Sequence, residues 1–149
     1  MDGHPRGYAL RKGRYSCPGQ IYLVTAVTAA REPVFRDVWA ARSLIRALMV
    51  EAQDQTALTL AYVVMPDHLH WLLELGEQHS LSRVMQRIKA VSAHRLGRPI
   101  WQKGFHDRAL RREDDLTNAA RYIVANPLRA GLVRNVGDYP HWDAVWLTT

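Results

Sequence analysis

The chain has 149 residues, which is the length of one domain, and 48% of them are hydrophobic and 23% charged. This composition excludes a disordered or fibrous protein. The longest uncharged stretch in the middle of the chain, residues 55–66, is too short to span a membrane, which takes about 20 apolar residues. No apolar run follows the basic N-terminus, so no signal peptide is expected. The single cysteine, Cys17, excludes an internal disulfide and favours a reducing cytoplasm.

The charge favours a polyanionic partner over a merely soluble basic surface. Twenty basic residues against 14 acidic ones give a net charge of +6, and only three of the twenty are lysine. The others are arginine, whose planar guanidinium matches phosphate at two points. Between Arg83 and Arg134 there are twelve basic residues and four acidic ones. This distribution predicts a nucleic-acid partner first and an anionic membrane second.

Hydrophobic periodicity and turn residues predict the following elements in chain order. They are a strand at 20–28, a helix at 36–53, strands at 57–65 and 68–75, a helix at 81–96, a strand within 100–111, and a helix from 114 or 115 to 126. The last helix is expected to stop before Pro127, because the residue before a proline disfavours helical geometry. A short helix at 128–133 is expected to follow it.

The ends of the chain are expected to be irregular. Residues 1–19 are rich in Gly, Arg and Pro and predict a basic arm, and 135–149 predict a C-terminal tail. No repeat or linker divides the chain, so we expect a single domain over 1–149. The order of elements predicts an α+β sandwich, with a mostly antiparallel sheet and helices packed on one face.

His68 and His70 are one residue apart in a predicted strand. Because strand side chains alternate between faces, both imidazoles project on the same face, and Leu69 and Trp71 point into the core. Two such imidazoles can chelate one divalent ion, or they can be ordinary solvent-facing or hydrogen-bonded histidines. Asp67, just before them, either orients an imidazole or completes the turn with Pro66.

Tyr122 and Asn126 lie four residues apart on a predicted helix, and so on one helical face. A tyrosine at such a position can be a core residue with its hydroxyl at the rim, or a nucleophile beside a metal ligand. Taken with the histidines, the second interpretation specifies a reaction. A metal held by His68, His70 and Asn126 would polarise a phosphodiester, and Tyr122 would attack the phosphorus.

Three segments carry a resemblance to a known family: AYVVMPDHLHWLLEL at 61–75, WQKGFHDRALR at 101–111 and ARYIVANPLRAGLV at 120–133. Together they resemble the single-tyrosine HUH transposases of the IS200-like group. Within that group the chain is most similar to the REP-associated tyrosine transposases, domesticated relatives found in bacteria beside repetitive extragenic palindromes. The resemblance extends from about residue 13 to residue 146, with the segments in the family's order.

The resemblance implies a ferredoxin-like sandwich in which the histidines of a central strand face the tyrosine helix. It implies that His68 and His70 hold Mg²⁺ or Mn²⁺ and that Tyr122 is the nucleophile. Asn126 matches the family's third ligand, although other members have Gln there. The implied substrate is single-stranded DNA near an imperfect hairpin, which is cleaved to a 5′-phosphotyrosine.

Two sets of basic residues are candidates for DNA binding. One is the N-terminal arm, and the other recurs at about one-turn spacing along the predicted helix at 81–96, where it can follow phosphates or simply be solvated. The candidates are Arg6, Arg11, Lys12, Arg14, Arg83, Arg87, Lys89 and Arg95. Trp101, Trp142 and Trp146 can stack on unpaired bases or pack in the core. We expect a monomer, rather than a homodimer, in the cytoplasm with the nucleoid and not at a membrane.

Two other functions compete with this one. A transposase-derived protein can grip DNA hairpins without cutting them, and it would bind equally well without the Tyr122 hydroxyl. A histidine-triad nucleotide hydrolase would need a third histidine two residues after His70, where this chain has Leu72.

Overall fold

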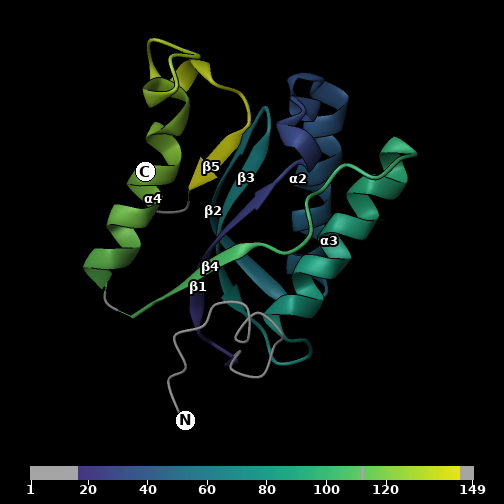
Figure 1. Ribbon diagram of the computed structural model, residues 1–149. Coiled ribbons are helices and arrows are strands. Elements are labelled where there is room, and N and C mark those ends of the chain that lie inside the picture. The colour runs from purple at the N-terminus through teal and green to yellow at the C-terminus, as the bar shows by residue number, and fades with distance from the viewer. Residues whose placement is uncertain (1–16, 112, 145–149) are drawn as a thin grey trace.

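The computed structural model describes residues 17–111 and 113–144, and its core is one antiparallel sheet (Figure 1). The strands are β1 (Ile21–Val27), β2 (Ala57–Met65), β3 (His68–Leu75), β4 (His106–Leu110) and β5 (Trp142–Ala144). They lie in the order β4-β1-β3-β2-β5, so β3 is the central strand. The helices are α2 (Val38–Gln53), α3 (Leu81–Leu96) and α4 (Glu113–Arg129), with short 3₁₀ turns at Ala29–Arg31, Val34–Arg36 and Val136–Asp138.

The first four strands and two helices alternate as β-α-β-β-α-β, and every neighbouring pair of strands is antiparallel. This is the ferredoxin-like arrangement. The predicted α+β class and antiparallel sheet are therefore confirmed. The predicted tail also contributes an edge strand, because β5 pairs with β2 through Ala61 and Ala144.

The expectation that the helices pack on one face is wrong. Helices α2 and α3 cover one face of the sheet and α4 covers the other, as Figure 1 shows. The cause lies in the central strand, which is apolar on both faces: Leu69 and Trp71 are fully buried toward α2 and α3, and Leu72 is fully buried toward α4. A sheet with two apolar faces needs a layer on each.

Capping residues fix the ends of the two helices on the first face. Asp37 Oδ1 accepts hydrogen bonds from the N–H groups of Trp39 and Ala40, at 2.8 and 3.1 Å, so α2 begins two residues later than the predicted start. Ser80 caps α3 by accepting from the Arg83 N–H. The predicted bounds of α3, 81–96, are confirmed.

Helix α4 does not stop at Asn126 as predicted but continues through Pro127 to Arg129. No separate helix forms at 128–133, because the chain leaves α4 at Gly131, whose φ is 74°. The Gly131 N–H bonds to the Leu128 carbonyl and the Leu132 N–H to the Pro127 carbonyl, which together satisfy the end of the helix. Pro127 is buried in the last turn, and because it has no N–H it makes no helical hydrogen bond to the Ile123 carbonyl.

Candidate functional site

The histidine pair lies on the central strand, on the face that α4 covers. The ring centroids of His68 and His70 are 4.7 Å apart, and the rings meet edge to face at 82°. Strand pairing sets Val27 of β1 opposite His68 and Thr25 opposite His70. The prediction that the two imidazoles share a face is confirmed.

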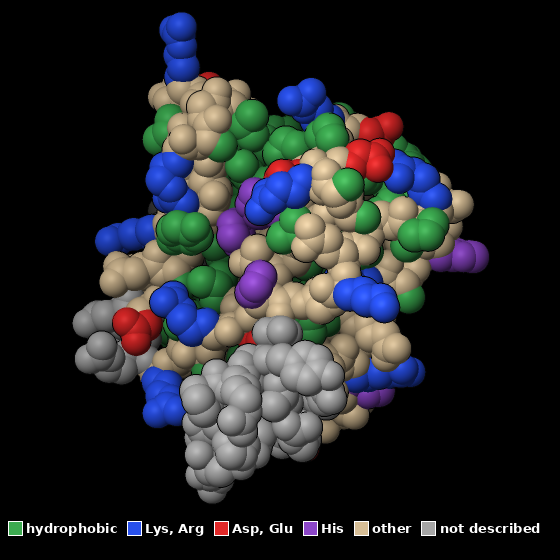
Figure 2. Space-filling view, in the orientation of Figure 1, with side chains coloured by type: hydrophobic (Ala, Val, Ile, Leu, Met, Phe, Trp, Pro, Cys, Tyr) green, Lys and Arg blue, Asp and Glu red, His purple; other side chains and the backbone are tan. Residues whose placement is uncertain are grey.

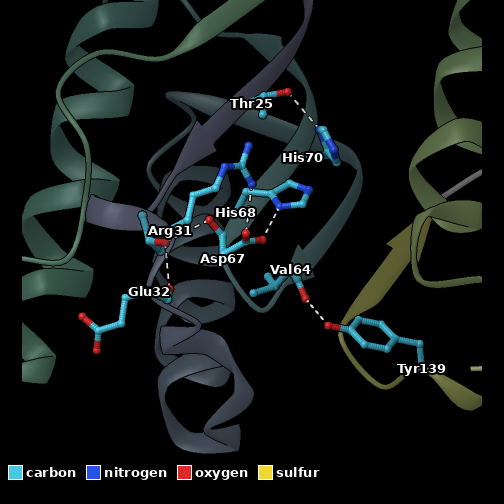
Figure 3. A network of polar contacts seen from close by, with 9 residues as sticks. Thr25, Arg31, Glu32, Val64, Asp67, His68, His70 and Tyr139 are labelled. Atoms are coloured by element: carbon cyan, nitrogen blue, oxygen red, sulfur yellow. Dashed lines mark hydrogen bonds and ion pairs between the residues drawn. The ribbon is translucent and has the colours of Figure 1, made fainter. Parts of the chain in front are cut away.

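A polar partner holds each imidazole at its Nδ1 atom (Figure 3). His68 Nδ1 lies 2.7 Å from Asp67 Oδ1, and Arg31 Nη1 donates to Asp67 Oδ2 at 2.9 Å. His70 Nδ1 shares a hydrogen bond of 2.9 Å with Thr25 Oγ1. When Nδ1 donates its proton to such a partner, Nε2 keeps the lone pair that binds a metal. Asp67 therefore does more than complete the turn.

The surroundings of the site favour a neutral His70 imidazole and a charged Asp67 carboxylate. Burial lowers the pKa of His70 to about 4, with the charges of His68 and Arg129 acting in the same direction. Burial alone would raise the pKa of Asp67, but hydrogen bonds from His68 and Arg31 outweigh it, and the pKa is lowered. A neutral imidazole is the form that coordinates metals.

Tyr122 reaches the histidine pair from the opposite layer. It lies on α4, its side chain is 46% exposed, and its ring centroid is 5.6 Å from that of His70. The guanidinium of Arg129 lies over the tyrosine ring, with Cζ 4.2 Å from the centroid, and its Nη2 donates to the Tyr122 carbonyl. The exposed ring is therefore in contact with both a histidine and an arginine.

Asn126 lies one turn after Tyr122, and its Nδ2 donates to the Tyr122 carbonyl at 3.3 Å. This bond orients the amide and does not use its oxygen. Within 17–111 and 113–144, no group of three His, Cys, Asp or Glu residues is placed to hold a metal. A third protein ligand among the described residues would thus have to be of another type, and the role of Asn126 stays a prediction.

A cleft of about 690 Å³ opens beside the histidine and the tyrosine, between α4 and the sheet. Its walls include Thr25, His70, Arg108, Asp115 and Tyr122, so both a cation and a carboxylate line it. In Figure 2 histidine side chains gather in the middle of this face, with arginine and lysine side chains around them. The cleft can therefore receive an anionic strand beside the tyrosine.

The predicted DNA-binding residues differ in whether the structure describes them and in whether their side chains are exposed. Arg6, Arg11, Lys12 and Arg14 lie outside the described residues, as does Trp146. On α3, Arg83 and Arg95 are exposed. Arg87 instead pairs with Glu51 and Asp54 at 3.0 and 2.9 Å, and Lys89 donates to the carbonyls of Gln102 and Gly104. These two side chains are used within the fold.

Sequence reasoning missed several residues of the site. Thr25, Arg31 and Arg108 come from segments far from the histidines in the chain. Strand pairing brings Thr25 and Arg108 close to them, and Arg31 reaches Asp67 from the 3₁₀ turn after β1. Arg129 had a usable signal, because it follows Tyr122 by seven residues, which is two helical turns.

Among the described residues no helix has the length and hydropathy needed to cross a membrane.

The fold and the site together define a class of protein: a ferredoxin-like sheet that presents two imidazoles to a tyrosine on a separate helix. The sequence pattern of the family described as "Transposase IS200 like" matches residues 17–125, most of the chain. The chain therefore belongs to the IS200-like transposase family, and the resemblance found in its sequence is confirmed.

Two relatives make the similarity more specific. The chain is 34% identical over 100 residues to a REP-associated tyrosine transposase of Escherichia coli K12. That match covers 65% of this chain and 60% of the relative, so the chain spans less than two thirds of it. A solved structure of a REP-associated tyrosine transposase bound to a REP hairpin superposes with a TM-score of 0.77 and 28% identity, covering 87% of this chain and 79% of that one.

Proposed function

We propose that this protein is a metal-dependent single-stranded DNA endonuclease and strand transferase that acts at palindromic hairpins through a 5′-phosphotyrosine. The observation that carries the proposal is the pairing of Tyr122 with His70, with ring centroids 5.6 Å apart, across two layers of the fold. A phenol held beside a pair of metal-ligating side chains is suited to nucleophilic attack on a phosphodiester.

The donor set suits a divalent cation. His68, His70 and the amide oxygen of Asn126 would hold it, since Asp67 and Thr25 occupy the Nδ1 atoms of the two rings and leave both Nε2 atoms available. A bound Mg²⁺ or Mn²⁺ would supply Lewis-acid polarisation of the scissile phosphate. Two imidazoles suit Mn²⁺, and oxygen ligands suit Mg²⁺.

Tyr122 performs the covalent step. Its Oη attacks the phosphorus as the phenol proton passes to solvent, a P–Oη bond forms, and the bond from phosphorus to the 3′ oxygen breaks. The leaving 3′ oxygen takes up a proton, and the 5′ end stays attached to the tyrosine. Attack by a DNA 3′ hydroxyl reverses the step and joins strands without ATP, because the phosphotyrosine ester conserves the energy of the broken bond. Phenolate is also a better leaving group than a serine alkoxide.

Hairpin DNA is the proposed substrate for two reasons. The solved relative is bound to a REP hairpin, and this chain superposes on it over most of its length. The chain carries a net charge of +6, and arginine and lysine side chains surround the histidines on the face shown in Figure 2. A basic surface gives affinity for phosphates, which is independent of sequence.

The test is a denaturing gel with a single-stranded hairpin taken from the DNA beside the gene and labelled at either end. With Mn²⁺ or Mg²⁺, we expect an adduct between the protein and the 3′-side fragment, and EDTA should abolish it. Tyr122→Phe and His68→Ala should also abolish it. Tyr62→Phe is the matched control, since it removes a phenol hydroxyl from β2 and should leave the adduct intact.

Hairpin binding without an adduct, on several candidate hairpins, would contradict the catalytic proposal. It would favour the alternative function, in which the protein binds hairpins without cleaving them. In that case binding should be the same for Tyr122→Phe and for the unchanged protein.

A further inference from the structure

A second cleft, larger than the one at the tyrosine, is lined by residues of α3 and of the loop that leads to β4. Figure 1 shows that this loop runs alongside α3. Its volume is about 910 Å³. Trp101, Phe105 and Met85 form an apolar part of its wall, and Gln86 and Gln102 contribute amides. The charged residues that line it, among those the structure describes, are the cations Arg83, Lys89 and Lys103. The occupant that fits such a wall is flat, apolar and anionic.

The aromatic wall is fixed in place. Lys89 Nζ donates to the Gln102 carbonyl at 2.8 Å and also to the Gly104 carbonyl, and so ties the loop to α3. The Trp101 indole N–H donates to Ser92 Oγ at 2.9 Å, and its ring packs on Phe35 with centroids 5.4 Å apart. Because these groups are already ordered, a bound ring would not have to organise them.

The polar groups of the cleft are not all used. Ser82 Oγ is buried in its wall and has no hydrogen-bond partner among the described residues. A buried polar atom without a hydrogen-bond partner destabilises the fold, so a ligand that supplies a partner there is favoured. Arg83 Nη1 donates to Gln86 Oε1 at 3.2 Å, and none of the ion pairs within the described residues involves Lys103. These groups can meet a base edge and a phosphate.

A smaller cavity of about 90 Å³ shares lining residues with this cleft and with the cleft at Tyr122. It shares Thr25 with the cleft at Tyr122, and it shares residues 102–105 with the cleft at α3. Thr25 is the residue that holds His70. The shared lining residues therefore place the small cavity, at the start of β4, beside each of the two clefts.

We propose that the cleft at α3 binds one unpaired nucleotide of the same DNA strand that reaches Tyr122. Its base stacks on the wall of Trp101 and Phe105, and its phosphate lies between Arg83 and Lys103. Base stacking on aromatic side chains is tolerant of sequence, and the flanking cations add affinity for the backbone. The inference rests on the proposed function and adds a position in the single-stranded flank to it.

The test measures binding rather than cleavage, so the full chain carries Tyr122→Phe throughout. Fluorescence anisotropy gives the Kd for a labelled hairpin with a single-stranded flank and for the same hairpin without one. Replacing the flank bases one at a time by abasic sites should find one position that weakens binding about tenfold. Phe105→Ala should weaken binding of the flanked hairpin by a similar factor and remove the effect of the abasic site there.

The double variant Arg83→Gln/Lys103→Gln avoids the risk that the loss of an aromatic ring disturbs folding. It should weaken binding of the flanked hairpin about tenfold and leave the hairpin without a flank unchanged. Arg46→Gln, which removes an exposed cation from α2, is the matched control and should change neither Kd.

The inference is overturned if the variants weaken binding equally for the hairpins with and without the flank, or if no abasic site in the flank weakens binding. Either result leaves the proposed function standing. Absence of binding to any hairpin would overturn both.

Discussion

Arg129 contacts Tyr122, the nucleophile of the proposed reaction, at two points. The guanidinium covers the ring at 4.2 Å and bonds to the tyrosine's own carbonyl, so it limits the motion of an exposed side chain. In the proposed reaction, a cation beside the ring would also stabilise the negative charge that develops in the transition state. Both effects depend on the arginine being on the same helix, two turns beyond the tyrosine.

Arg129→Ala should therefore slow adduct formation about fivefold, which corresponds to a cation–π contact of about 1 kcal/mol at an exposed site. The measurement is the single-turnover rate of adduct formation at saturating DNA. Arg121→Ala removes another exposed cation from α4 and is the control. Equal rates for the two variants would show that Arg129 does not position the tyrosine.

Asp67 is the second residue whose effect is indirect. It holds His68 at Nδ1 and is itself held by Arg31. Asp67→Asn should weaken metal binding about 10- to 100-fold, the range found when such supporting hydrogen bonds are lost. Calorimetric titration with Mn²⁺ measures this directly, and the unfolding midpoint without metal controls for damage to the fold. An unchanged Kd for Mn²⁺ would contradict the role given to Asp67.

For individual helices and strands, the sequence predicts those boundaries that are determined by residues close together in the chain. The bounds of β2, β3 and α3 are as predicted, since turn and cap residues define them locally. The side of the sheet that α4 covers was not predictable from periodicity, because the central strand is apolar on both faces. The partners of Arg87 were not predictable either, because Glu51 in the last turn of α2 and Asp54 just after it lie more than 30 residues earlier in the chain.

The end of α4 supports a prediction about stability. Gly131 ends the helix at a φ of 74°, and a Cβ added there would meet nothing within 4 Å. Gly131→Ala should therefore cost about 1 kcal/mol through backbone strain alone. Gly137→Ala is the control, since that position also has open space and has no positive φ. Urea unfolding of the two variants measures the difference, and equal stabilities would contradict the strain.

At the scale of the whole molecule, the segment after α4 ties the sheet to the second helical layer. The Tyr139 hydroxyl donates to the Val64 carbonyl at 2.6 Å (Figure 3), and burial raises the pKa of Tyr139 to about 12.

The histidines and the tyrosine of the site come from one chain, so a single copy holds all of them. The expected monomer stays a prediction.

Tyr139 also makes stability depend on pH. Its folded pKa lies above the value of 10.0 for the unfolded chain, so its contribution is complete below pH 10 and is lost as the pH rises toward 12. Tyr139→Phe should be about 1 kcal/mol less stable at pH 8, because it loses a buried hydrogen bond. Above pH 10 its stability should fall less steeply than that of the unchanged protein, by up to about 1.4 kcal/mol per pH unit.

Urea unfolding from pH 8 to 11 tests this difference. Tyr22 and Tyr62, whose pKa values burial also raises, are present in both proteins and cancel in the comparison. Parallel pH profiles for the two proteins would contradict the assignment to Tyr139.

The central claim is that Tyr122 becomes covalently linked to DNA, and mass spectrometry of the adduct tests it most directly. The protein is incubated with hairpin DNA and Mn²⁺, digested with nuclease and protease, and the modified peptide is sequenced. We expect a 5′-linked nucleotide on Tyr122 alone, with a free 3′ hydroxyl on the released strand. A nucleotide on another residue, or DNA cleaved with no covalent linkage, would contradict the account.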